Sequence, residues 1–223
     1  MSKKSMVLAA LIFFFAGLLH GTAFAGTGKA SAALNEAAEQ GDLAKVKSLL
    51  AKNKIDLNAQ DNTGMTPLMM ASMGGNLDIV KFLLSKKVKL ELKNNGGETA
   101  LAFAVTNDNY EVAQALITAG ANVDISVAGD EQDTLFMRAA ANDKKTAEII
   151  LGKNKALINK TNKLGETALF SVARYGTPED IQFLIKHGAN LKLKNSKGQS
   201  ALDAAKEASN ADTTALLAKK IKK

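Results

Sequence analysis

One leucine recurs along this chain at an almost constant interval. Five strings, "TPLMMASMGG", "TALAFAVTND", "DTLFMRAAAND", "TALFSVARYG" and "SALDAAKEAS", align on Leu68, Leu101, Leu135, Leu169 and Leu202. The intervals are 33, 34, 34 and 33 residues, and Leu34 in "LNEAAEQGD" stands one further interval before the first of them. A fixed period of this length is typical of repeat arrays, in which one unit cannot bury its apolar face alone and must stack on its neighbours. The sequence therefore predicts a solenoid of six units.

Each unit predicts two short helices. Polar side chains that can cap the first helix stand just before the leucine, at Thr66, Thr99, Asp133, Thr167 and Ser200. Three positions after the leucine, a small or apolar residue allows close helix packing, at Ala37, Ala71, Ala104, Val172 and Ala205. Seven positions after it, a residue that tolerates left-handed backbone is expected to end the helix, at Gly41, Gly75, Asp108, Asn142 and Gly176. A second helix with apolar residues at helical spacing follows each time.

The first 25 residues have the three parts of a secretory signal peptide. Lys3 and Lys4 form the positive start, residues 7–19 are apolar, and Ala23 and Ala25 fit cleavage after Ala25. The alternative is an uncleaved membrane anchor, but the apolar run is shorter than the roughly 20 residues that cross a bilayer. We therefore expect an exported protein.

The composition limits the cellular compartments in which the protein is expected. After cleavage the chain keeps 27 basic and 22 acidic residues, and it has no cysteine. An exported chain without disulfides must be stabilised by its hydrophobic core. These features favour the bacterial periplasm, with secretion outside the cell as the second possibility.

The stretch "GMTPLMMASMGGNLDIVKFLLSKK" combines the 33-residue period with a T-P-L-x-x-A pattern, and here the chain resembles ankyrin-repeat proteins. The resemblance is to an exported, periplasmic bacterial type. It implies an all-α solenoid of six helix-turn-helix repeats with short β-turn or hairpin connections. The signal peptide is then residues 1–25, a disordered stub residues 26–30, and the repeat domain residues 31–223. The repeats are expected at about 31–58, 59–92, 93–125, 126–159, 160–193 and 194–223.

The sequence departs from the family pattern in two ways. The usual histidine after the leucine is replaced in all six repeats, by Asn35, Met69, Ala102, Phe136, Phe170 and Asp203. The fourth repeat has one extra residue in "VAGDEQDTL", and Arg138 stands where other repeats have alanine or valine. We expect a local distortion or a paired charge there.

The residues give little support for catalysis or for a cofactor. After the signal peptide the chain has one histidine, His187, at a position where the family has a polar turn residue. The acidic run of Asp130, Glu131 and Asp133 lacks the glycine loop and terminal glutamate of an EF-hand, so a solvated turn is preferred to a calcium site. With two arginines and no tryptophan, nucleic-acid binding is not expected. We predict no enzyme activity, cofactor or metal, and no stable membrane insertion after signal cleavage.

By its resemblance to ankyrin proteins, the chain is expected to bind a partner with the turn tips and the exposed side of the first helices, which form its concave face. Carried over position by position, this gives Met65, Met73, Asn95, Glu98, Asn107, Asp130, Glu131, Lys163, Leu164, Arg174, Tyr175 and Lys197. Two places are physically distinctive. Met65 and Met73 sit at normally exposed positions and predict a pliable apolar patch. Arg174, Tyr175 and Leu164 combine residue types that are enriched in interface hot spots.

The function predicted from these observations is non-catalytic binding of another periplasmic or exported protein. The leading hypothesis is an inhibitor that protects the cell from an exported enzyme, such as a cell-wall hydrolase. The alternatives are a stabiliser or scaffold of another periplasmic protein, such as an antioxidant enzyme, and a salt-sensitive binder of an anionic envelope polymer. Because solenoids are quasi-linear, we expect a monomer in the absence of a partner.

Overall fold

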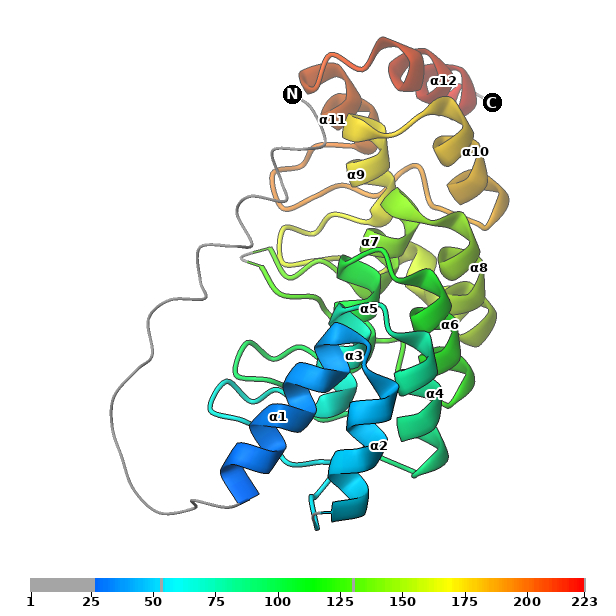
Figure 1. Cartoon of the computed structure of the whole chain (residues 1–223). Coiled ribbons are helices and arrows are strands. Elements are labelled where there is room, and N and C mark those ends of the chain that lie inside the picture. Colours follow the sequence, from blue (N-terminus) through cyan, green and yellow to red (C-terminus); the bar gives the residue numbers. More distant parts are fainter. Residues whose placement is uncertain (1–26, 53, 130, 223) are drawn as a thin grey trace.

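The computed structural model describes residues 27–52, 54–129 and 131–222, and the predicted signal peptide lies outside these ranges. The described residues form six pairs of antiparallel helices, in which the odd-numbered member is the first helix of each repeat (Figure 1). The helices are α1 (Thr27–Gln40), α2 (Leu43–Lys52), α3 (Pro67–Met73), α4 (Leu77–Ser85), α5 (Ala100–Thr106), α6 (Tyr110–Thr118), α7 (Leu135–Asn142), α8 (Lys144–Lys153), α9 (Ala168–Tyr175), α10 (Pro178–Lys186), α11 (Ala201–Glu207) and α12 (Ala211–Ile221). A short 3-10 helix, η3 (Lys155–Asn159), follows α8.

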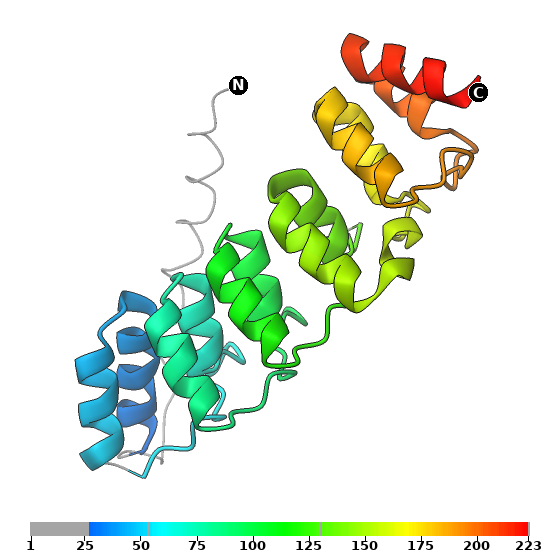
Figure 2. The ribbon, with the colours of Figure 1, turned by 90° about the vertical axis from the view of Figure 1, so that its right-hand side faces the viewer.

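The pairs stack side by side in chain order (Figure 2), which confirms the all-α solenoid. First helices form one layer and second helices the other, and the turns between repeats project away from the second helices (Figure 1). Within the described ranges, β-structure is limited to two isolated bridges, Ser126 with Thr134 and Lys194 with Ser200, at the stems of two of these turns.

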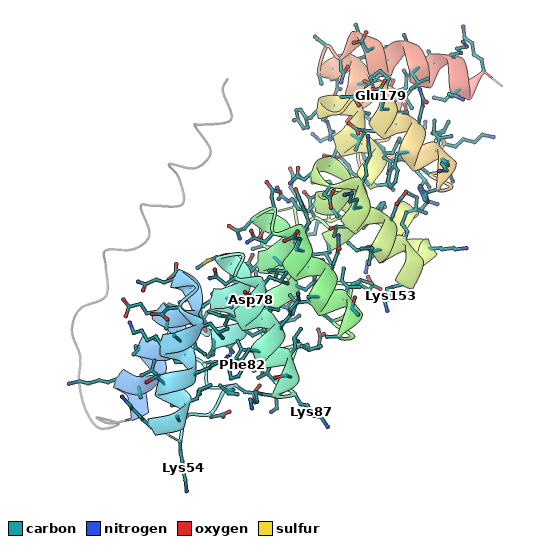
Figure 3. The ribbon with its side chains drawn as sticks, turned by 45° about the vertical axis from the view of Figure 1, so that its right-hand side comes forward. Lys54, Asp78, Phe82, Lys87, Lys153 and Glu179 are labelled. Atoms are coloured by element: carbon teal, nitrogen blue, oxygen red, sulfur yellow. The ribbon has the colours of Figure 1, made fainter. Side chains whose placement is uncertain are left out.

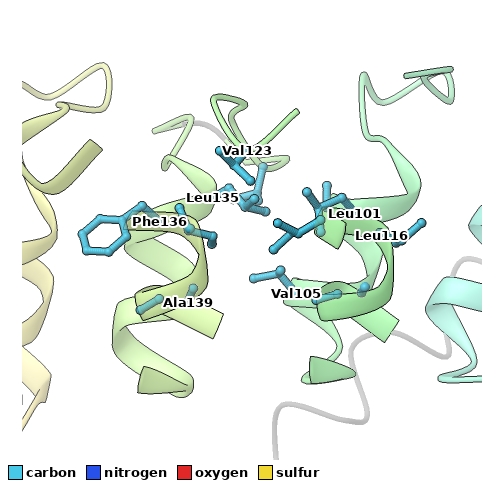
Figure 4. Packing of buried hydrophobic residues seen from close by; sticks show 14 of the residues in the cluster. Leu101, Val105, Leu116, Val123, Leu135, Phe136 and Ala139 are labelled. Carbon is cyan, nitrogen blue, oxygen red and sulfur yellow. The ribbon is translucent and has the colours of Figure 1, made fainter. Parts of the chain in front are cut away.

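The core runs through the whole stack, because each repeat covers the apolar face of the next. In Figure 4, Leu101 and Val105 of the third repeat face Leu135 of the fourth, and all three are at most 1% exposed. The alanines three positions after the leucine are fully buried, as at Ala71 and Ala104. Their small side chains let successive first helices approach closely.

The predicted helix caps hold in three repeats and fail in two. Thr66, Thr99 and Ser200 each accept a hydrogen bond from the backbone N–H three residues on. In the fourth repeat the cap is Thr134 and not Asp133, because the extra residue in the preceding turn shifts the register by one. Thr167 occupies the N-cap position without a capping hydrogen bond from its side chain.

The predicted left-handed positions hold at Gly41, Gly75 and Asp108, whose φ values are 79°, 72° and 59°. The prediction is wrong for the next two repeats. Asn142 is the last residue of α7, and Gly176 has a φ of −90°. In the fourth repeat Asp143 ends one helix and caps the next, so no left-handed residue is needed between them.

The beginning of the domain also differs from the prediction. Helix α1 begins at Thr27, so residues 27–30, which we expected to belong to a disordered stub, form its first turn. The helix signal "KASAALNEAAEQ" is rich in alanine and continues upstream of Ser31 without a breaker.

Asparagine side chains join several neighbouring repeats. Asn76 donates hydrogen bonds from Nδ2 to the carbonyl oxygens of Ala38 and Glu39 at the end of α1, at 2.8 and 2.6 Å. Asn109 and Asn210 make the same kind of contact to the ends of α3 and α9. We call these contacts the asparagine bridges.

The fourth repeat lacks such a bridge on either side. Asp143 and Thr177 occupy the equivalent positions, and each caps its own helix instead. Helices α5 and α7 also approach less closely than the other successive first helices. Arg138 lies in α7, its Nε is buried without a hydrogen-bond partner, and no described acidic residue forms an ion pair with it. The structure therefore shows the local distortion that was expected, and not the paired charge.

Candidate protein-binding surface

The turn tips and the outward side of the first helices, where the binding residues were predicted, lie on one side of the solenoid. We call this surface the turn face (Figure 1). Because the second helices form the opposite layer, the turn face is presented along the whole length of the stack.

The turn tips that precede α3, α5, α9 and α11 are each held by a polar residue at their first position, which is Asp61, Asn94, Asn162 or Asn195. Asn162 accepts hydrogen bonds at Oδ1 from the backbone N–H groups of Leu164 and Glu166, both at 3.0 Å. Asn195 makes the same pattern in the next turn with Lys197 and Gln199. The side-chain oxygen thus accepts hydrogen bonds that a backbone carbonyl would accept in an ordinary turn. A glycine with positive φ, such as Gly165, completes the turn. The turns are therefore ordered structures and not loose loops.

Neighbouring tips are also bonded to each other. The backbone N–H of Ser196 donates to the carbonyl of Leu164 at 2.8 Å, and that of Lys163 donates to Glu131 at 3.0 Å. Asn95 donates in the same way to the carbonyl of Thr63. Among the described residues, these contacts make a ladder along the turn face that joins the second turn to the third, and the fourth turn to the fifth and sixth, with no such bond between the third and fourth repeats.

Leu164 and Tyr175 are the main apolar features of this face. Tyr175 is 83% exposed and Leu164 is 38% exposed, and only one other large apolar side chain of the described residues is classed as exposed. Tyr175 ends α9, and Leu164 lies in the turn that precedes that helix. An aromatic ring that loses so little water contact on folding is available for burial against a partner.

Arg174 is placed differently from the prediction that grouped it with Tyr175 as a contact residue. Its guanidinium forms two hydrogen bonds with the carboxylate of Glu166, at 2.6 and 2.5 Å, and Glu166 is only 6% exposed. Asn195 donates to the same carboxylate at 3.0 Å. The guanidinium lowers the pKa of Glu166 below its ordinary value, and the carboxylate raises the pKa of Arg174. Arg174 thus fastens α9 to the turn beneath Tyr175.

Asn195 was missed as a contributor to this site. The signal was present in the sequence, because Asn162 and Asn195 stand three residues before a glycine in successive turns. That spacing predicts a turn held by the asparagine, but it gives no sign that the side chain also reaches a carboxylate in the neighbouring repeat.

The methionine prediction is wrong for Met65. Its side chain is 7% exposed and belongs to the core, where Asn94 Nδ2 lies 3.7 Å from its sulfur. Met65 directly precedes the capping Thr66, so its side chain points under the turn. Met73 is half-buried and packs on the core, as does Phe103 one repeat later. The apolar patch in this half is therefore smaller than predicted.

The remaining predicted residues are distributed along the turn face. Exposed side chains at turn tips or helix ends are Asn95, Asn107, Glu131, Lys163 and Lys197, and Glu98 is half-buried. Asn95 also donates from its side chain to the carbonyl of Asn62 at 3.0 Å. Asp130 lies outside the described residues.

The described ranges contain no cluster of three or more histidine, cysteine or acidic residues that could hold a metal ion. None of the helices in those ranges combines the length and apolar character needed to cross a membrane. One hollow of about 660 Å³ opens between the third and fourth repeats, and its lining includes Glu91, Lys93 and Asp124. Its side chains do not form the nucleophile–base geometry that catalysis requires.

Comparison with known proteins identifies the repeat. A family model described as "Ankyrin repeats (3 copies)" matches residues 34–127 and 136–223. The unmatched residues between them contain the inserted turn of the fourth repeat. Among curated proteins, the chain is 40% identical over 67 residues to human NAD-capped RNA hydrolase NUDT12. That match covers 30% of this chain and only 14% of the hydrolase.

Two solved structures match over most of the chain. One is described as the Bd0816 predatory endopeptidase from Bdellovibrio bacteriovorus in complex with immunity protein Bd3460, and the matching chain is 82% identical with a TM-score of 0.84. The match covers 84% of this chain and 97% of that one. The second is the ankyrin-repeat protein EF0377, which is 25% identical, with a TM-score of 0.72 and the same two coverages.

Proposed function

The chain belongs to the ankyrin-repeat family, and we propose that it is an immunity protein that binds and inhibits an exported endopeptidase of its own cell. One observation carries this proposal. The chain is 82% identical, over 97% of the matching solved chain, to a repeat protein whose structure is a complex of a predatory endopeptidase with its immunity protein. Identity at this level over a whole binding domain supports the same class of partner.

The turn face is suited to this role because it is rigid before binding. Its tips are closed by side-chain hydrogen bonds and joined by a backbone ladder. A surface that is already ordered loses less conformational entropy on association than a flexible loop does. A rigid row of projecting turns can cover a catalytic cleft without entering it as a substrate would.

Tyr175 is the residue on which we expect this binding to depend most. Its side chain is highly exposed, and the helix that carries it is held in place. Arg174, the preceding residue of α9, bonds to Glu166 in the turn before that helix. Buried tyrosines at interface centres commonly contribute 2 kcal/mol or more. Leu164, in the turn that precedes α9, is a second exposed apolar side chain of the same repeat.

The proposed setting is the bacterial periplasm, reached through the signal peptide predicted at residues 1–25. An endopeptidase that cuts cell-wall peptides is dangerous to the cell that exports it, so an inhibitor is needed in the same compartment. We also propose that the chain is non-catalytic and monomeric until it meets its partner.

Inhibition can be tested with purified chain and the Bd0816 endopeptidase, measuring peptide cleavage against inhibitor concentration. Tyr175→Ala should weaken inhibition by about 30-fold or more, as expected for a hot spot. Tyr110→Ala is the matched control, because Tyr110 lies on the second-helix layer and hydrogen-bonds to Asp108; it should leave inhibition unchanged. If the endopeptidase kept its full turnover in the complex and only became more heat-resistant, the protein would be a stabiliser and the proposal would fail.

A further inference from the structure

The ends of the second helices carry a charge pattern that protein binding through the turn face does not use. In an ankyrin stack these helices run parallel, so their C-terminal ends lie along one edge (Figure 2). Eleven lysines stand in or just after those ends, at Lys52, Lys54, Lys86, Lys87, Lys89, Lys153, Lys155, Lys186, Lys219, Lys220 and Lys222. No acidic residue occurs in the same segments. We call this row the lysine edge.

The lysine edge is an uncompensated concentration of charge. Of the 27 lysines and arginines after residue 25, the other 16 share the chain with 22 acidic residues, so the remainder of the protein is net negative. Within the described ranges none of the eleven lysines forms an ion pair. All eleven are exposed. The protein is therefore strongly polarised, with its positive charge on one edge.

Helix stabilisation does not account for the whole row. Lysines favour the last turn of a helix because they interact with its dipole, and that effect is confined to the last turn. Lys54, Lys89 and Lys155 lie beyond the helix ends. In addition, α6 ends without any lysine, so a neutral end is compatible with this stack.

The edge points away from the turn face. Figure 3 shows Lys54, Lys87 and Lys153 extending outward in a row, each at or just beyond the end of a different second helix. Asp78 lies near the beginning of α4, at the opposite end of the helix that Lys87 follows (Figure 3). A surface bound to the lysine edge would leave the turn tips free.

A hollow interrupts the edge between α8 and α10. It has a volume of about 400 Å³, and Lys155, Lys186 and His187 line it together with Glu148, Leu151 and Gly152. His187 Nε2 is buried there without a hydrogen-bond partner, 3.8 Å from the Glu148 carboxylate. The 3-10 helix η3, present only after α8 among the described second helices, supplies Lys155. The lining of the hollow thus combines two lysines and one histidine with a single acidic residue, Glu148, so the basic side chains outnumber the carboxylate.

We propose that the lysine edge docks on an anionic phospholipid membrane, with one headgroup phosphate in the hollow between α8 and α10. Three features favour a membrane over a polymer chain. The charges come from lysines alone, which act as point charges without the fixed geometry of arginine. They are spread over five repeats along the length of the protein, as contact with an extended surface requires. The hollow is confined to one repeat junction, so it accommodates a headgroup and not a continuous strand.

Attraction of this kind is reversible and depends on salt. A lysine near an anionic leaflet contributes about 1 kcal/mol, or roughly fivefold in affinity, and the effect decays within a Debye length. Ile221, which is 41% exposed among the three C-terminal lysines of the edge, adds a small apolar contact. Docking would concentrate the inhibitor at the membrane surface, where exported enzymes emerge, with its turn face directed outward.

The test is co-sedimentation of the chain lacking residues 1–25 with vesicles of phosphatidylethanolamine containing about one third phosphatidylglycerol. We expect binding at low salt, at least tenfold weaker binding in about 0.5 M salt, and none to phosphatidylcholine vesicles. The edge variant is K86Q/K87Q/K153Q/K155Q, and it should lose binding at least tenfold. The matched control is K45Q/K47Q/K81Q/K145Q, which removes four exposed lysines of the second helices that lie away from the edge and should lose less than threefold.

Both variants should keep their far-ultraviolet circular dichroism and their inhibition of the endopeptidase, which separates this inference from the proposed function. Equal losses in the two variants, or equal binding to neutral vesicles, would overturn membrane docking. Membrane docking would also be overturned if the chain bound purified cell-wall sacculi but no vesicles, and if the edge variant lost that binding. The partner of the lysine edge would then be a polymer. Inorganic phosphate at millimolar concentration should compete with vesicles for the chain that has Lys155 and Lys186. It should not compete when these two lysines are replaced.

Discussion

The asparagine bridges make a quantitative prediction about stability, and Asn109 is the clearest case. Its Nδ2 donates to the carbonyl oxygens of Ser72 and Met73, both at 2.9 Å, at the end of α3. The last carbonyls of a helix have no partner within the helix. Replacing Asn109 by alanine therefore leaves two carbonyl groups in a partly buried junction without their donor.

The expected cost follows from the two bonds. A typical hydrogen bond contributes about 1 kcal/mol net, so Asn109→Ala should lower the free energy of unfolding by about 2 kcal/mol. For a domain of this size that corresponds to a fall in Tm of roughly 4–8 °C. No cap is lost, because Asn109 makes no capping hydrogen bond from its side chain.

Urea unfolding followed by circular dichroism measures this cost, with the slope of the transition checked because repeat arrays can depart from two-state behaviour. Asn107→Ala is the matched control. Its side chain is exposed and donates only within its own helix region, to Phe103 and Thr106, so its cost should stay within about 0.5 kcal/mol. If the two alanine variants unfolded at the same urea concentration, the asparagine bridges would not be what couples these repeats.

Three further outcomes are expected. Glu166→Gln should lower the free energy of unfolding by about 1–2 kcal/mol at pH 7, because it weakens the charged pair with Arg174. That pair lowers the pKa of Glu166 in the folded protein. The difference from wild type should therefore fade in urea titrations as the pH falls below about 4. Gly64→Ala should destabilise far more than Gly97→Ala in thermal unfolding, because both glycines have positive φ but only the first would bring Cβ within 2.7 Å of neighbouring backbone. Met65→Ala should cost about 3 kcal/mol by urea unfolding and leave inhibition unchanged once folded, as a core residue would.

The fold could be predicted from the sequence because the period is set by local chemistry repeated six times. A capping residue, a core leucine and a small residue at fixed offsets are enough to specify two helices and their packing. One error arose where a residue was added. The insertion before Asp133 moved the cap to Thr134, and a register counted from the leucine of other repeats could not show that shift.

The binding surface could be predicted only in outline. Position in the repeat indicates which residues lie near the turn face, but it does not say how side chains pair there. Arg174 and Met65 stand at positions that are exposed in the general pattern, yet one is engaged by Glu166 and the other lies under a turn. Both outcomes depend on contacts between residues far apart in the chain, and a single sequence does not encode these contacts as a readable pattern.

The distribution of contacts between repeats indicates which part of the turn face is already ordered before a partner binds. The bridge from Asn210 joins the fifth and sixth repeats, and Leu164 lies in a turn whose neighbours bond to it on both sides. The junctions of the fourth repeat lack an asparagine bridge, because Asp143 and Thr177 replace the asparagines and their side chains cap their own helices. The two exposed apolar side chains of the turn face, Leu164 and Tyr175, therefore both lie in the fifth repeat, on the C-terminal side of the junction between α5 and α7. A partner held by these side chains would bind a part of the turn face that is already ordered, whereas a partner that also contacts the first three repeats would have to span that less closely packed junction.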